Sequence, residues 1–263
     1  MFKVRNTLFK TNLSPKLCLH IYDTLVRPIS TYCSEVWGVF TKNISKMFQL
    51  SNEKYQLFDE ACFEKTDLKF SKSILGVNRM ACNAAVRGEL GRHPMIIYVI
   101  KQILKNWVRI VDYDRASVLH DAYLCNWNLT MQNKTGWLSK IKDLVCDTLK
   151  MKHVWENQGG ENNFKQVNTV ITNVRYIYQF HWSNEINRKN NNGKPGKGLR
   201  TYALCKKTFE YENYLDFHTD FKKRRLITKI RISAHKLEIE TGRYQGKTHK
   251  RKKPEERLCK HCD

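Results

Sequence analysis

The sequence lacks the paired carboxylates with which polymerases and nucleases hold two metal ions. No two aspartates are adjacent, and the nearest pair, Asp112 and Asp114, falls in a helical pattern that points its two side chains to different sides. No phosphate-binding glycine loop, no nucleophile elbow and no HExxH motif is present. Nine cysteines and nine histidines allow many chance pairs, so none stands out as a nucleophile with its base. We therefore expect this chain not to be an enzyme.

Glycine and proline are also scarce, with 12 and 5 residues, and this composition disfavours a loop-rich sandwich or barrel. No apolar run approaches the ~18 residues that would span a membrane. The N-terminus has no apolar segment typical of a secretory signal. The cysteines are scattered and odd in number, which indicates reduced thiols. We expect a nuclear or cytoplasmic protein that is not secreted.

Apolar residues recur at three- and four-residue spacing, and no alternating strand pattern is found. We therefore predict an all-α fold, an irregular multi-helix bundle with a smaller basic helical unit at its C-terminal end. The polar, glycine- and asparagine-rich stretch 188–198 is the best candidate linker. The predicted divisions are a helical region over 1–187, this linker, a basic helical unit over 199–245, and a flexible basic tail over 246–263. The expected helices cover 15–27, 28–40, 55–75, 83–90, 95–119, 137–149, 164–187, 199–211, 214–221 and 223–238.

Positive charge is abundant, with 47 Lys and Arg against 25 Asp and Glu and a net charge of +22. Half of it lies between Lys222 and Lys260, where 15 basic residues face 4 acidic ones. This balance favours a polyanionic partner, RNA or DNA, over a membrane surface or a plain solvated face. In the expected helix 223–238, Leu226, Ile230 and Leu237 would dock inward while the basic edge contacts phosphates. The predicted nucleic-acid contacts are Lys222, Lys223, Arg224, Arg225, Lys229, Arg231, Lys236, Arg243, Lys250, Arg251, Lys252 and Lys253.

Cys259 and Cys262 form a Cys-x2-Cys pair at the end of the sequence. Such a pair is half of a tetrahedral zinc site, which needs four ligands. We expect an incomplete metal site here and no cofactor bound by this chain, although a longer parent protein could hold zinc. Two free thiols in a tail and a redox pair are the alternative interpretations.

Several segments resemble a known family. Leu25 to Gly38 reads LVRPISTYCSEVWG, Phe70 to Val77 reads FSKSILGV, and Asn83 to Arg92 reads NAAVRGELGR. Together with His235 to Tyr244 and Glu256 to Cys259, they resemble the region after the polymerase core in non-LTR retrotransposon reverse transcriptases. Cys33 stands where that pattern usually has glycine.

The resemblance implies a thumb and C-terminal linker fragment, truncated within the zinc-binding motif of its parent. The parent would be an RNA-directed DNA polymerase whose palm and endonuclease domains lie outside this chain, and the palm would be a partner where present. The implied role is to grip template RNA and target DNA without catalysis. A helical protein-interaction module and a non-functional product of a decayed mobile element are the alternative hypotheses.

Overall fold

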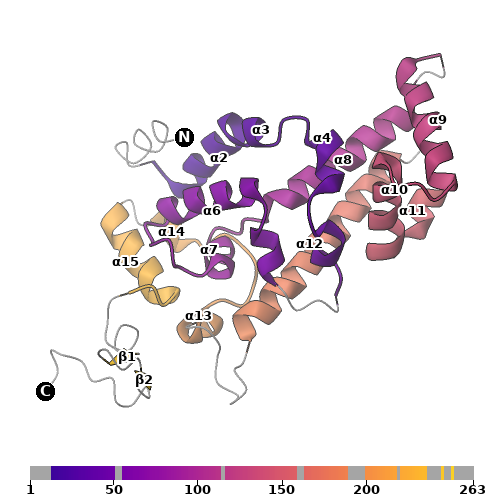
Figure 1. Cartoon of the computed structure of the whole chain (residues 1–263). Coiled ribbons are helices and arrows are strands. Elements are labelled where there is room, and N and C mark those ends of the chain that lie inside the picture. The colour runs from indigo at the N-terminus through magenta and orange to yellow at the C-terminus, as the bar shows by residue number, and fades with distance from the viewer. Residues whose placement is uncertain are drawn as a thin grey trace, which may run out of the picture. The chain divides into compact units, whose positions relative to one another are not determined.

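The structure is a computed structural model that describes residues 13–50, 55–113, 116–158, 163–188, 199–217, 220–235, 244–245 and 250–251. Helices account for nearly all of the secondary structure in these ranges (Figure 1). The strands described there are the two-residue β1 (Tyr244–Gln245) and β2 (Lys250–Arg251), which pair antiparallel. The predicted all-α fold class is confirmed.

The helical elements range from single turns to α12, which has 25 residues. Their bounds are α2 Pro15–Leu25, α3 Arg27–Ser30, α4 Ser34–Trp37, η1 Gly38–Phe40, α5 Ile44–Met47, η2 Tyr55–Asp59, α6 Cys62–Ile74, α7 Asn83–Glu89, α8 Met95–Val111, α9 Val118–Met131, α10 Trp137–Lys142, the π-helical η3 Asp143–Thr148, α11 Lys152–Glu156, α12 Asn163–Asn187, α13 Arg200–Cys205, α14 Tyr214–Phe217 and α15 Phe221–Arg231.

The expected helix 55–75 is divided into η2 and α6, and two other long expected helices are broken at points where the backbone shows why. The expected helix 28–40 is interrupted at Cys33, which adopts a left-handed conformation with φ 54° that no right-handed helix accommodates. The expected helix 95–119 ends at Val111, and α9 begins anew after Ser117, whose hydroxyl accepts a hydrogen bond from the His120 amide at 3.2 Å. α9 continues to Met131, in a stretch that none of the expected helices covered.

The chain forms two compact units, and each unit combines segments that are distant in the sequence. Unit 1 comprises residues 1–21, 68–92 and 186–263, and unit 2 comprises 22–67 and 93–185. The predicted domains were contiguous instead, and the predicted linker 188–198 lies almost wholly outside the described residues. The two units are described separately below.

Unit 2 is built around α8, whose apolar residues recur at helical spacing and are mostly buried. The buried Glu64 carboxylate of α6 accepts a hydrogen bond from the Ile96 amide at 2.7 Å, which satisfies an open donor in the first turn of α8. Trp107 stacks on Trp155 with ring centroids 5.7 Å apart, and Trp155 stacks on Trp127 at the same spacing. These aromatic rings form one continuous stack that runs from the buried Trp107 and Trp155 to the half-buried Trp127.

Three tryptophans of unit 2 are buried in its core. Trp107, Trp155 and Trp182 are 2%, 6% and 2% exposed, whereas Trp37 is 36% exposed. Trp37 therefore lies on the surface of unit 2.

Candidate nucleic-acid interface

Helix α15 belongs to unit 1 and carries the first six of the predicted phosphate contacts. It begins after Asp220, whose carboxylate accepts a hydrogen bond from the Lys222 amide at 2.7 Å. An acidic N-cap residue accepts a hydrogen bond from an amide that has no partner within the helix, and its negative charge is stabilised by the positive end of the helix dipole. The sequence thus places the start of α15 at the head of the run Lys222–Arg225.

Arg224 and Thr228 form the buried face of α15. Their side chains are 6% and 0% exposed, and Ile232 just after the helix is 3% exposed. The Thr228 hydroxyl donates to the Arg224 carbonyl oxygen at 2.9 Å and lies 2.8 Å from the Tyr214 hydroxyl. Arg224 therefore packs into unit 1, and its guanidinium is not presented to solvent as the sequence suggested.

Arg231 is held by a buried carboxylate. Its Nε donates to both carboxylate oxygens of Glu89, at 3.1 and 3.2 Å, and its Nη2 forms ion pairs with Glu89 at 3.1 Å and Glu212 at 3.0 Å. The Tyr214 hydroxyl also donates to Glu89, and Lys206, 2% exposed, pairs with Glu212. Arg231 is thus a structural cation of unit 1.

Burial raises the pKa of Glu89, whose side chain is fully enclosed, while the Tyr214 hydrogen bond and the charge of Arg231 act in the opposite direction. Removing one partner of such an enclosed pair leaves an uncompensated charge, at a cost of about 3–5 kcal/mol. This cluster, composed of Glu89, Arg231, Glu212, Tyr214 and Lys206, is called the Glu89 network below.

Arg225 is also engaged by the fold, although it is exposed. Its Nε donates to the Gly76 carbonyl oxygen at 2.9 Å. Gly76 follows the last turn of α6 with φ +65°, a conformation that glycine adopts without strain. A guanidinium at this helix end satisfies an open carbonyl and opposes the negative end of the dipole.

The solvent face of α15 differs from the predicted one. Lys222 and Lys223 are exposed and Lys229 is half-buried. Leu226 and Ile230 are exposed as well, by 60% and 44%, so the prediction that they dock inward is wrong. Arg224 and Arg231 point into unit 1, where the buried Glu89 requires a cation, while Leu226 and Ile230 lie on the exposed side of the helix.

The remaining predicted site residues are not placed by the structure. Lys250 and Arg251 form strand β2, whose backbone alone is described. Lys236, Arg243, Lys252, Lys253, Cys259 and Cys262 lie outside the described residues. Within the described ranges, no three His, Cys, Asp or Glu side chains are grouped so that they could hold a metal ion.

Two segments that carry the family resemblance meet α15 and its surroundings within unit 1. Gly76 of ILGV receives Arg225, and Glu89 of NAAVRGELGR receives Arg231. The Glu89 carbonyl oxygen accepts from the Glu212 amide at 3.0 Å, and Leu90 forms a bridge with Tyr211. Gly91 adopts φ +56°, and a Cβ there would lie 2.5 Å from the Tyr211 nitrogen. Sequence reasoning missed this arrangement, although a charged residue inside an apolar helix such as Glu89 was a usable signal.

Unit 2 presents a second surface, which is apolar. Ile29, Tyr32, Val36 and Phe40 are 78%, 78%, 57% and 57% exposed. An open groove lies beside them, lined by Ser30, Trp37, Phe40, Thr41, Cys62, Phe63 and Thr66. Exposed apolar patches of this kind are typical of protein-interaction sites.

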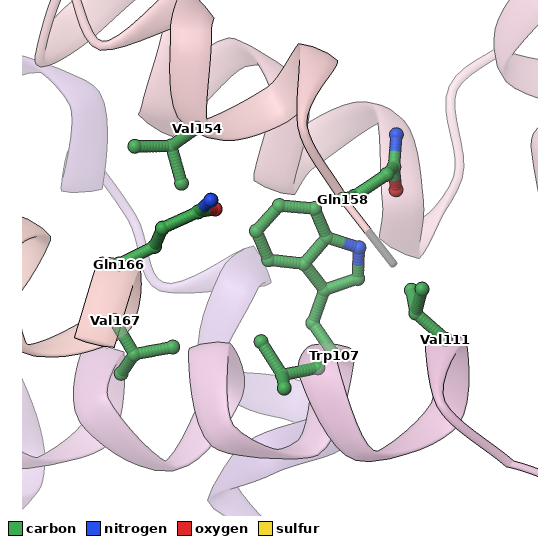
Figure 2. Close-up of a pocket in the computed structure, with 7 residues that line it drawn as sticks. Trp107, Val111, Val154, Gln158, Gln166 and Val167 are labelled. Carbon is green, nitrogen blue, oxygen red and sulfur yellow. The ribbon is translucent and has the colours of Figure 1, made fainter. Parts of the chain in front are cut away.

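Unit 2 also contains a small internal cavity beside Trp107 (Figure 2). The cavity volume is about 10 Å³, and the space lies between valine side chains, with the amides of Gln158 and Gln166 on either side of the indole. No hydrogen-bond partner for the Trp107 Nε1 is found among the described residues. The lining has no charged side chain, so it offers no group for acid–base or nucleophilic chemistry.

No described helix combines the length and the apolar character needed to cross a bilayer. Comparisons of the chain with protein-family models, with curated proteins and with solved structures give no match.

Proposed function

We propose that this chain binds RNA or DNA without catalysis, as the thumb and C-terminal linker of a non-LTR retrotransposon reverse transcriptase. The family assignment is supported by the segments quoted from the sequence, two of which hold α15 in unit 1 through Gly76 and Glu89. Binding is supported by the net charge of +22. A palm domain of the parent protein would supply the chemistry, and zinc would belong to that longer protein.

The binding proposal rests on one observation, the different environments of the arginines and the lysines of α15. Arg224, Arg225 and Arg231 serve the fold, whereas Lys222 and Lys223 extend into solvent. Lysine is a compact charge on a flexible stem and neutralises phosphates without requiring one fixed geometry. The proposed contact is therefore electrostatic, tolerant of sequence and sensitive to salt.

The test compares Lys222→Ala/Lys223→Ala with the wild type in filter binding at several salt concentrations. Each phosphate contact contributes about 0.9 to the slope of log affinity against log salt on duplex DNA and about 0.7 on single strands, so we expect the slope to decrease by about 1.4–1.8. The substituted lysines are exposed, so the thermal stability should change little.

The matched control is Lys65→Ala/Lys165→Ala, which removes the same charge from two exposed lysines of unit 2. An equal loss from both double variants would show that net charge alone, and not α15, determines binding. A wild-type protein whose binding does not depend on salt would overturn the proposal.

The exposed apolar surface of unit 2 favours a second candidate, a helical protein-interaction module. Ile29, Tyr32, Val36 and Phe40 offer the aliphatic and aromatic area that stable protein interfaces bury. The same salt titration separates the two candidates, because a module of this kind would bind nucleic acid weakly and with a shallow salt dependence.

A further inference from the structure

The solvent face of α15 carries both basic and aliphatic residues. Lys222, Leu226 and Ile230 follow one another at four-residue spacing, so they form one line along the helix. Lys223 lies one turn from Leu226 on the adjacent line. Leu226 and Ile230, 60% and 44% exposed, therefore form an aliphatic strip with lysines beside it, called the Leu226 strip below.

This strip is not explained by the stability of the helix. The inward positions of α15 are filled by Arg224, Thr228 and the cation of the Glu89 network. Aliphatic side chains that remain in water gain nothing from folding, but they gain from contact with an apolar surface of a ligand. The ligand that fits this face has apolar surface at its centre and anionic groups beside it.

We propose that α15 binds single-stranded nucleic acid, with bases lying on the Leu226 strip and phosphates on Lys222 and Lys223. This inference rests on the proposed function and names its ligand class. In a single strand the bases are unstacked, and their apolar faces are available to protein side chains. Neighbouring phosphates then lie within reach of the flanking lysines.

A duplex fits this face less well. In the major groove of DNA, Leu226 and Ile230 would meet base edges that are mainly hydrogen-bond donors and acceptors, and covering these without partners costs free energy. The major groove of duplex RNA is too deep and narrow for side chains to read. A membrane surface fits poorly as well, because interfacial helices need an extended apolar face and α15 presents two aliphatic residues.

The experiment measures Leu226→Ala/Ile230→Ala against a labelled oligouridylate, an RNA hairpin duplex and a DNA duplex. We expect about tenfold weaker binding to the single strand, because two aliphatic contacts are lost, and an unchanged salt slope. Affinity for both duplexes should change by less than about twofold, since phosphate contacts dominate there. The matched control is Leu124→Ala/Met131→Ala, which truncates two α9 residues that are 45% and 52% exposed.

The outcomes separate this inference from the proposed function. If Lys222→Ala/Lys223→Ala weakens all three probes and Leu226→Ala/Ile230→Ala weakens none, the nucleic-acid function stands and the single-strand inference is wrong. Equal losses on single strand and duplexes would also overturn it. If the aliphatic variant loses binding to phosphatidylserine vesicles but keeps the oligouridylate, the strip is a membrane contact and the inference fails.

Discussion

Arginine and lysine occupy different environments on α15 for a chemical reason. The planar guanidinium of Arg231 can donate to both oxygens of Glu89 and still reach Glu212, which a single ammonium could not do from one position. Lys222 and Lys223 keep their charges in water, where hydration is not lost. The composition gives the sum of these charges. Which basic side chains point into the unit and which point into solvent depends on Glu89, which lies far away in the sequence. The site prediction therefore included Arg224 and Arg231, which pack inside, together with Lys222 and Lys223, which are exposed.

At this scale we predict that Arg231→Leu destabilises the protein by about 3–5 kcal/mol, because Glu89 is left charged and fully buried. Glu89→Leu/Arg231→Leu should cost less than the single variant, since no uncompensated charge is left at that position. Urea denaturation measures both free energies of unfolding. Lys223→Ala serves as the control and should stay within about 0.5 kcal/mol of the wild type. A stable Arg231→Leu protein with weakened RNA binding would instead indicate that Arg231 contacts phosphate.

Helices were predictable where a single periodic face is buried. The starts of α2, α8 and α12 fall within one residue of the expected ones, because apolar spacing and polar or proline residues mark them. Positions that depend on backbone conformation were not predictable. Cys33 divides the expected helix 28–40 with a positive φ that nothing in the residue type signals. The outward face of α15 was misassigned because its aliphatic residues satisfy helical spacing as well as core residues do.

At the scale of elements we predict that Gly91→Ala destabilises unit 1 by about 2–4 kcal/mol, from the cost of a positive φ and the collision of the new Cβ with the Tyr211 backbone. The bridge between Leu90 and Tyr211 should loosen, which hydrogen exchange of the Tyr211 region would detect. Gly136→Ala is the comparison, because Gly136 is extended and its Cβ would meet only the Asn126 side-chain oxygen at 3.2 Å. Its cost should be about 1 kcal/mol or less.

On the scale of the whole molecule, the class of the fold was predictable and its division was not. Helical periodicity without strand alternation indicated an all-α protein, and the structure confirms this. A polar stretch at 188–198 suggested contiguous domains. Unit 1 instead joins residues 68–92 to 186–263, because Glu89 and Gly76 find their partners in the C-terminal helices. Pairings of this range leave no local signal in one sequence. All the predicted nucleic-acid contacts stay predictions, and the side chains of those beyond His235 lie outside the described residues.

The whole protein should lose stability in mild acid. Burial, aided by the charge of Arg175, lowers the pKa of His93 to about 4, and burial also lowers the pKa of His181. A histidine that is neutral when folded stabilises the fold above its unfolded pKa of about 6.5, and this contribution is lost as the pH falls toward 4. We expect His93 to account for about 2 kcal/mol between pH 7 and pH 5.

Thermal unfolding followed by circular dichroism at several pH values measures this loss. His93→Gln should flatten the dependence on pH in that window, whereas His153→Gln, which alters an exposed histidine, should leave it as in the wild type. Parallel curves for His93→Gln and the wild type would contradict the assignment.

The distribution of the tryptophans makes their fluorescence a reporter of one unit. All six lie within unit 2, three of them in the stack, while unit 1 contains tyrosines but no tryptophan. Selective excitation of indole emission therefore observes the melting of one unit alone, without any introduced dye. A single tryptophan substituted on the exposed side of α15 would add a second, separable reporter, with which ligand capture by unit 1 could be timed directly.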